Sequence, residues 1–421
     1  MSFWKRLKKI GQKVGPGIVT GASDNDPSGG LTYLQSGFAF GFKTLWLALV
    51  NLPFMISIQE MSARLGYATD KGLARLIKEH FHPSVLRLVA ITSVIVITVN
   101  IGADLLAVGT VFHELVGLPT ALWLFATAAL VLFFTIFFSY PKFAAVLKWL
   151  TLSLFFYVAT VFVIHINWGE AFLATIVPHV TWDKDFVMLM AAFFGTTVSP
   201  YLFFWQASEE VEDREETTRE KHLRRFLVTK NELKHLRRDT ASGMIYSEVT
   251  TWFIIVAAAG LFFAHGPQMI LNFTQASEVL RPLLGPFAFI AFALGIIGTG
   301  LLAIPVLAGS VGYILSEMFG WVEGMNKTWR EARSFYLVIV TATAVGLALN
   351  LFGFDPVRLL IATAVLYTII TPPLIWVIIK LANKKEVLHE RTNTPWANFG
   401  AYATFLFSVF VAAAYLVITF F

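Results

Sequence analysis

The chain has 421 residues, a formal net charge of +5 and a sequence pI of about 9.2. Hydrophobic residues make up 57% of it, charged residues 14%, and the mean hydropathy is +0.68, which is too apolar for an ordinary soluble domain. The sequence contains no Cys, which excludes a disulfide framework and any thiolate metal site. We therefore expect a multi-pass membrane protein.

A membrane-spanning helix needs about 20 predominantly apolar residues. Eleven stretches meet this requirement after a short N-terminal segment, residues 1–14. The predicted spans are residues 15–40, 44–66, 84–109, 118–140, 143–166, 185–207, 240–264, 285–315, 333–352, 356–380 and 397–420. The first apolar stretch is interrupted by acids and a proline, unlike the core of a cleaved signal, so we expect no signal peptide.

The loops divide the basic residues very unequally. With the N-terminus in the cytoplasm, only four of the 32 Lys and Arg residues fall outside, namely Lys43, Lys184, Arg281 and Arg358. The positive-inside rule therefore predicts a cytoplasmic N-terminus and, with an odd number of spans, an external C-terminus. This asymmetry accounts for the basic pI without nucleic acid as a partner. We expect the protein to lie in the cell membrane, with the lipid bilayer around it.

The first predicted span carries an acid at its centre. Asp26 is followed directly by Pro27, so a regular helix cannot continue there, and backbone carbonyls and amides lose their helical partners. Such groups are tolerated at membrane depth only inside the protein or along a cavity. An ionisable residue at this depth is by default a candidate functional residue.

The sixth predicted span has a second break, at residues 195–201, where small polar residues precede Pro200. Corresponding breaks in two halves indicate a transporter site between inverted repeats. The repeats would be residues 15–166 and 185–380, with residues 397–420 outside both. The alternative is that Pro27 and Pro200 only kink two helices. A buried carboxylate costs at least roughly 2.5 kcal/mol without compensation, which favours a cation site.

A charged stretch, residues 209–239, separates the sixth span from the seventh. Its alternating acidic and basic runs predict a cytoplasmic helical connector with i,i+4 charge pairs. The alternative is a solvated charge run that only links the two spans.

Over nearly its whole length the chain resembles the Nramp family of divalent-metal transporters. The similarity is carried by Gly15-Pro16-Gly17, Leu34-Gln35-Ser36-Gly37, Phe40-Gly41-Phe42, Leu45-Trp46, Ile58-Gln59 and Leu65-Gly66. The resemblance implies an all-α LeuT-type fold with eleven spans, discontinuous helices 1 and 6, and no enzymatic activity. The family's Asp-Pro-Gly-Asn motif reads Asp26-Pro27-Ser28-Gly29 here, and its Ala-Thr-Val-Met-Pro-His motif corresponds to residues 196–201.

The departures from these motifs concern the ligands. The family's methionine falls at Ser199, and its asparagine falls at Gly29, which removes a ligand and is expected to open space. The remaining donors are all oxygen atoms, which suits Mg²⁺ with its retained waters better than Mn²⁺ or iron. The expected site residues are Asp26, Ser23, Ser28, Gly29, Thr196, Thr197, Ser199 and Tyr201.

The family's proton-handling residues are also replaced. Its helix-3 acids align with Ala103 and Leu106, and its helix-6 histidines with Tyr201 and Gln206. Asp104 lies one position away, on a different face, where it could line a water path or pair with a neighbour. This pattern resembles the Nramp-related magnesium transporters, in which proton coupling is lost. Asp24 could attract cations or cap the half-helix that follows it.

We therefore expect a divalent-cation transporter that takes up hydrated Mg²⁺ by alternating access without proton coupling, with no tightly bound cofactor and Mn²⁺ as the other possible cargo. One alternative is a proton-coupled manganese or iron importer. A second is a sodium-coupled organic-solute transporter of the same fold, which Asp26 disfavours because it would repel a substrate carboxylate. No set of nucleophile, base and orienting residue suggests an enzyme.

Overall fold

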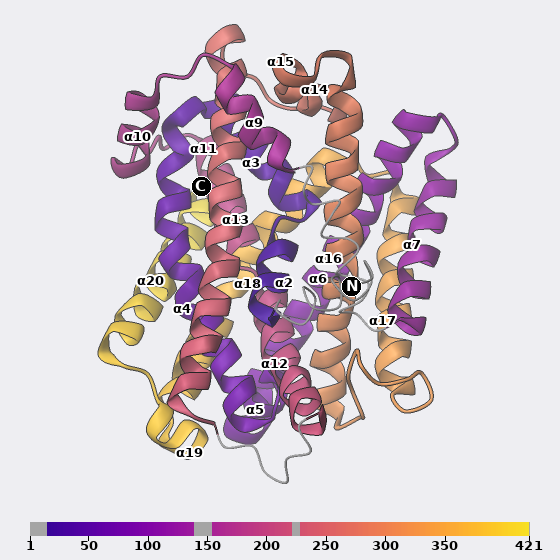
Figure 1. The fold of residues 1–421 in the computed structure, drawn as a ribbon, viewed down its shortest axis with the longest axis vertical. Helices are drawn as coiled ribbons and strands as arrows, with labels where there is room; N and C mark the ends of the chain where they lie inside the picture. The colour runs from indigo at the N-terminus through magenta and orange to yellow at the C-terminus, as the bar shows by residue number, and fades with distance from the viewer. Residues whose placement is uncertain (1–14, 139–153, 221–227, 421) are drawn as a thin grey trace, which may run out of the picture.

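The computed structural model describes residues 15–138, 154–220 and 228–420, and over this part of the chain all regular structure is helical (Figure 1). The longer helices run roughly parallel to one axis of the molecule. Their bounds are α2 Pro16–Asp24, α3 Pro27–Phe40, α4 Leu45–Thr69, α5 Leu73–His80, α6 Pro83–Val116, α7 Thr120–Phe137, α9 Phe155–Val163, α10 Trp168–Ile176, α11 Lys184–Thr197, α12 Pro200–Glu220, α13 Lys230–His265, α14 Phe273–Ser277, α15 Arg281–Leu284, α16 Ala288–Phe319, α17 Arg333–Leu349, α18 Pro356–Asn383, α19 Lys385–Leu388 and α20 Pro395–Phe420.

Nine helical segments of the described chain are long and apolar enough to cross a membrane. The segment Pro27–Thr69 joins much of the first predicted span to the second through the short 3₁₀ turn Gly41–Thr44. The fifth predicted span, residues 143–166, begins outside the described residues, and only its end appears, as α9. The total of eleven spans and the inverted repeat therefore stay predictions.

Local signals set the helix ends. The long helix α13 begins with a capping box, in which the Thr229 hydroxyl accepts from the Glu232 amide and the Glu232 carboxylate accepts from the Thr229 amide. Proline occupies the first position of α3, α6, α12 and α18, where its missing N–H is not needed. Gly117 ends α6 with a φ of 81°, which is a left-handed conformation that glycine adopts without strain.

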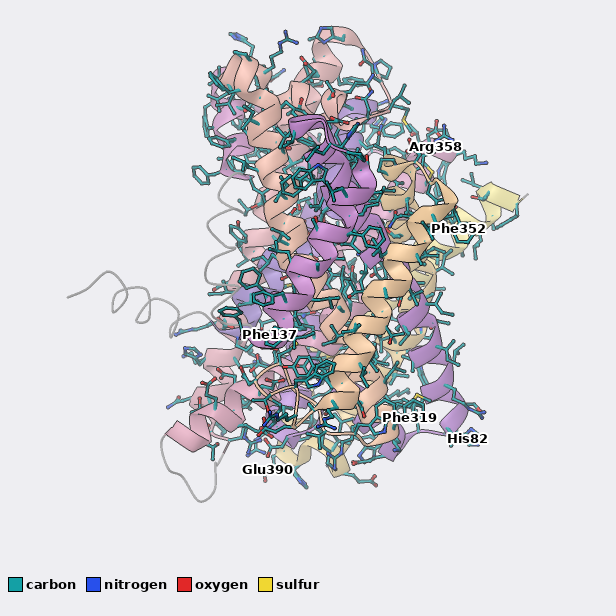
Figure 2. The ribbon with its side chains drawn as sticks, turned by 90° about the vertical axis from the view of Figure 1, so that its right-hand side faces the viewer. His82, Phe137, Phe319, Phe352, Arg358 and Glu390 are labelled. Atoms are coloured by element: carbon teal, nitrogen blue, oxygen red, sulfur yellow. The ribbon has the colours of Figure 1, made fainter. Side chains whose placement is uncertain are left out.

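Loops that were predicted to share one side of the membrane lie at the same end of the bundle. In Figure 1, α5 and α19 lie at the bottom, whereas α10, α14 and α15 lie at the top. Figure 2 shows His82 and Glu390 near one end and Arg358 near the other. Between these ends the surface carries exposed aromatic side chains such as Phe137, which suits a lipid environment.

Glycines bring α2 and α13 into backbone contact. A β-carbon added at Gly21 would lie 2.2 Å from the Gly243 carbonyl oxygen, and one added at Gly243 would lie 2.0 Å from the Gly17 carbonyl oxygen. The Gly17 amide also donates to Asp239 Oδ2 at 2.7 Å. Small residues at a helix interface allow this close approach in membrane proteins. The half-helix α2 is therefore held against α13 without intervening side chains.

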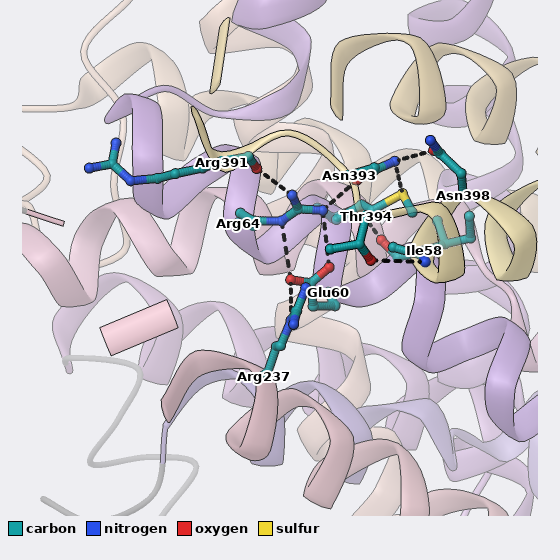
Figure 3. A network of polar contacts seen from close by, with 11 residues as sticks. Ile58, Glu60, Arg64, Arg237, Arg391, Asn393, Thr394 and Asn398 are labelled. Atoms are coloured by element: carbon teal, nitrogen blue, oxygen red, sulfur yellow. Dashed lines mark hydrogen bonds and ion pairs between the residues drawn. The ribbon is translucent and has the colours of Figure 1, made fainter. Parts of the chain in front are cut away.

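A polar network fixes the end of α4 (Figure 3). The Glu60 carboxylate lies 3.1 Å from Arg64 Nε and 3.0 Å from Arg237 Nε of α13, and Arg64 also donates to Asn393 Oδ1 at 2.5 Å. Glu60 and Arg64 thus form an ion pair with i,i+4 spacing. It ties α4 to α13 and to the segment before α20.

Candidate metal site

Both breaks occur at the residues that the prolines indicated. The helix α2 ends at Asp24, and Asp26 adopts an extended conformation before Pro27 starts α3. Asp26 is the N-cap of α3, because its Oδ1 atom accepts from the Gly29 amide at 2.6 Å. The helix α11 ends at Thr197, and Pro200 starts α12. Each break thus places the start of a half-helix in the interior.

The two breaks face one another. The Tyr201 hydroxyl donates to the Ser23 carbonyl at 3.2 Å, which joins the start of α12 to the end of α2. A β-carbon at Gly29 would lie 3.0 Å from Thr196 Oγ1, so these residues of α3 and α11 are in direct contact. The structure therefore brings Ser23, Asp26, Gly29, Thr196 and Tyr201 together.

Gly29 does not open space here, contrary to the expectation from the sequence. A β-carbon at this position would also lie 3.2 Å from the Asp24 carbonyl oxygen and 3.3 Å from Asp26 Oδ1. The close approach of α11 fills the volume that the missing side chain leaves. In this conformation, Gly29 permits contact between the two broken helices.

The other predicted residues have different partners. The Ser28 hydroxyl donates to the Leu360 carbonyl of α18 at 3.0 Å. Thr197 Oγ1 donates to the Phe193 carbonyl at 3.0 Å and accepts from Asn51 of α4 at 2.9 Å. These bonds direct Ser28 and Thr197 toward neighbouring helices.

Ser199 closes the end of α11. Its hydroxyl lies 2.7 Å from the Gly195 and Thr196 carbonyl oxygens, to which it can donate. The Ser199 hydroxyl proton is therefore used within the break. Ser199 can bind a cation only through the lone pairs of its oxygen.

Two further helices complete the surroundings of Asp26, and the sequence did not predict their contributions. Asn100 of α6 donates to Asp26 Oδ2 at 3.0 Å and accepts from Thr363 of α18 at 3.0 Å. Asp26 is only 2% exposed. Its carboxylate is thus oriented by donors from α3 and α6 and is enclosed by the bundle.

Asp104 is a further carboxylate near this site. It lies one helical turn after Asn100 on α6, is fully buried, and neither of its oxygens has a hydrogen-bond partner in the described chain. Its charge repels that of Asp26. The i,i+4 spacing of Asn100 and Asp104 places both on one face of α6, and this spacing is the signal that could have identified them.

Asp24 does not cap the half-helix that follows it. Asp26 performs that role, and Asp24 is the last residue of α2. The Asp24 carboxylate accepts instead from the Ser247 hydroxyl of α13. The capping interpretation of Asp24 was therefore wrong, because Asn25 and Asp26 separate the end of α2 from the start of α3 and Asp26 is the residue next to Pro27.

The charged connector also differs from a solvated run. The helix α12 continues to Glu220, and Glu210 and Glu212 within it are buried. Glu212 accepts from the amides of Met325 at 2.7 Å and Asn326 at 2.9 Å. Glu212 thus holds the loop after α16, which is a role that the charge pattern alone could not reveal.

The sequence profile of the Nramp family, described as natural resistance-associated macrophage protein-like, matches residues 17–419. The chain belongs to the Nramp family. The expectation that it is not an enzyme is thereby confirmed, because this is a family of transporters.

Relatives and solved structures agree with membership of the Nramp family. The chain is 25% identical over 394 residues to the divalent metal cation transporter MntH of Pectobacterium carotovorum, covering 91% of this chain and 88% of that protein. The crystal structure of the Eremococcus coleocola manganese transporter matches with a TM-score of 0.72 and 16% identity, over 99% of this chain and 87% of that one.

A second solved structure, MhsT in complex with L-phenylalanine, has a TM-score of 0.60 and 14% identity, over 96% of this chain and 97% of that one. At these identities the two structures support the fold alone. The family match makes the protein a membrane transporter, and the two solved structures show that its helical fold has LeuT-like neighbours.

Proposed function

We propose that this Nramp-family protein is a multi-pass cell-membrane transporter of divalent metal cations and that its cargo is hydrated Mg²⁺, taken up by alternating access without proton coupling. The relatives' names support divalent metal transport. The choice of Mg²⁺ rests on the donors around Asp26.

The donor chemistry is the observation that carries the proposal. Asp26 and Asp104 provide carboxylates, and Ser23, Thr196 and Tyr201 provide carbonyl or hydroxyl oxygens. Mg²⁺ binds oxygen, keeps several waters and commonly uses one or two carboxylates. In the described chain, no group of three or more His, Cys, Asp and Glu residues could hold a metal, so waters would complete the coordination.

Sulfur is absent from the position where the family motif has methionine. Ser199 occupies it, and its oxygen is a hard donor that gives no advantage to softer transition metals. The membrane potential can drive uptake of the hard cation, because moving two charges through 100 mV is worth roughly 4.6 kcal/mol.

The other candidate is a proton-coupled manganese importer. It is favoured by the name of the Eremococcus coleocola relative and by Asp104, which places a titratable carboxyl near Asp26. The replaced positions 103, 106, 201 and 206 argue against it, since none carries a carboxylate or imidazole. A sodium-coupled organic-solute transporter is disfavoured because Asp26 would repel a substrate carboxylate.

Uptake by the purified protein in liposomes separates these candidates. A Mg²⁺ indicator and a pH indicator inside the same vesicles should report Mg²⁺ entry without acidification of the lumen. Asp26→Ala should abolish uptake, whereas Glu390→Gln, which changes an exposed carboxylate, should transport normally. Mn²⁺ entry accompanied by a comparable proton flux that Asp104→Asn removes would establish the manganese importer instead.

A further inference from the structure

A second group of buried oxygen atoms lies between the end of α2 and the middle of α13. It comprises Asp24, Asn25, Ser247 and Glu248. Each of these residues is at most 3% exposed. The Asp26 carboxylate is not a member of the group, because its oxygens accept from donors of α3 and α6, although its charge repels that of Asp24.

The hydrogen bonds within the group run in one direction. Asn25 Nδ2 donates to Ser247 Oγ at 3.0 Å, and Ser247 Oγ donates to the Asp24 carboxylate. These two hydrogen bonds use the Ser247 hydroxyl proton and end at the Asp24 carboxylate. They supply nothing to Glu248.

Four oxygen atoms of the group have no hydrogen-bond partner in the described chain. They are Asp24 Oδ1, Asn25 Oδ1, Glu248 Oε1 and Glu248 Oε2. The two carboxylates are close enough for their charges to repel. Neither carboxylate forms an ion pair with a described Lys or Arg.

Buried carboxylates in proteins are normally paired, hydrogen-bonded or bound to a metal. A cation would supply the missing partner here, because all four unsatisfied atoms of the group are acceptors. The buried Tyr33 hydroxyl, on which the charges of Asp24 and Glu248 both act, is a nearby donor, but its single proton cannot satisfy four oxygens. Two carboxylates balance a double positive charge, and a set composed only of oxygen atoms suits a hard ion such as Mg²⁺ or Ca²⁺.

We propose that Asp24, Asn25 and Glu248 form a second site for a hard divalent cation, supported by Ser247. The ion bridges the end of α2 to α13. It thereby links the first half of the broken helix to a continuous helix through atoms other than the Asp26 carboxylate. The proposal goes beyond transport, since the second site can be filled whatever the cargo is.

Binding stoichiometry tests this site directly. The purified full-length protein is equilibrated with Mg²⁺ by dialysis, and the bound metal is measured per chain. The wild type should bind two equivalents, and Glu248→Gln, which keeps the shape and removes the charge, should bind one. Asp26→Asn should also retain one equivalent, and the variant with both substitutions should lose both.

The controls separate this proposal from the proposed function. Glu390→Gln should bind as the wild type does, and size-exclusion profiles should show that each variant is folded. If Glu248→Gln does not fold, Asp24→Asn provides the same loss of one equivalent. Equal Mg²⁺ binding by the wild type and a folded Glu248→Gln or Asp24→Asn variant would overturn the second site while leaving transport through Asp26 intact.

A proton is the competing occupant. If the wild type binds only one Mg²⁺ and Glu248→Gln changes only the number of protons taken up on acidification, the pair is a protonation site and the proposal is wrong. If Asp26→Ala loses uptake but still binds the one Mg²⁺ per chain that Glu248→Gln removes, each site is supported independently of the other.

Discussion

Two adjacent glycines of α3 offer a matched test of how closely the broken helices meet. A β-carbon at Gly29 would lie 3.0 Å from Thr196 Oγ1 and 3.2 Å from the Asp24 carbonyl oxygen, whereas one at Gly30 would have no neighbour within 4 Å. We predict that Gly29→Ala destabilises the protein and weakens Mg²⁺ uptake, and that Gly30→Ala does neither.

The magnitude follows from two opposing effects. Replacing glycine by alanine within a helix stabilises it by roughly 0.5–1 kcal/mol, and both variants share this gain. Overpacking typically costs about 1–3 kcal/mol, and only Gly29→Ala incurs it. The free energies of unfolding of the two variants should therefore differ by roughly 1–3 kcal/mol. If about 1 kcal/mol of this cost falls on the metal-bound conformation, Mg²⁺ affinity decreases about fivefold.

Unfolding in mixed micelles would give the stability difference, and uptake into liposomes would give the apparent affinity. Thr196→Ala in the Gly29→Ala background should recover part of both losses, because it removes the nearest atom but leaves the Asp24 carbonyl oxygen. Equal stability and equal uptake for Gly29→Ala and Gly30→Ala would refute the inferred contact between α3 and α11.

Three other predictions concern ion selectivity, the orientation of the Asp26 carboxylate and the dependence of stability on pH. Ser199→Met should shift the transported ion from Mg²⁺ toward Mn²⁺ in competition assays, because it replaces a hard oxygen donor by a thioether, and an unchanged preference would show that this position does not set selectivity. Asn100→Ala should raise the KM for Mg²⁺ more than Thr363→Val does, because it leaves Asp26 Oδ2 without its donor at a cost of roughly 1–3 kcal/mol. Burial raises the pKa of Glu323, in the loop between α16 and α17, from 4.5 to about 9, so the folded protein retains a proton that the unfolded chain loses, and stability should fall as pH rises through that range. Thermal unfolding measured across this pH range should show that the melting temperature of Glu323→Gln falls less steeply with pH than that of the wild type. Identical pH profiles for the two proteins would contradict the raised pKa of Glu323.

The two breaks were predictable because their causes are local. Proline cannot donate a backbone hydrogen bond, and the structure places helix starts at Pro27 and Pro200. Proline alone is not sufficient, because Pro53 and Pro305 lie inside continuous helices, so the polar residues that precede Pro27 and Pro200 are part of the local signal. The carboxylate that caps α3 is next to its proline in sequence. Short-range chemistry was therefore sufficient to locate Asp26.

The residues around Asp26 were harder to predict because their contacts are distant in sequence. Asn100 is 74 positions away from Asp26, and Thr363 is 263 positions away from Asn100. A single polar residue in an apolar helix does not identify its partner. Likewise, the motif gave the position of Ser28 but not its direction, and only the packing of α18 determines that its hydroxyl meets Leu360.

The glycine contact between α2 and α13 determines how these helices can separate. Interlocked side chains would resist sliding more strongly than the close contact between the backbones at Gly17, Gly21 and Gly243 does. Hydrogen bonds then restrain α2 at both of its ends. The Gly17 amide donates to Asp239 at one end, and the Ser247 hydroxyl donates to Asp24 at the other. Movement of α2 away from α13 would therefore require these two hydrogen bonds to break, and we expect their loss to be a large part of its free-energy cost.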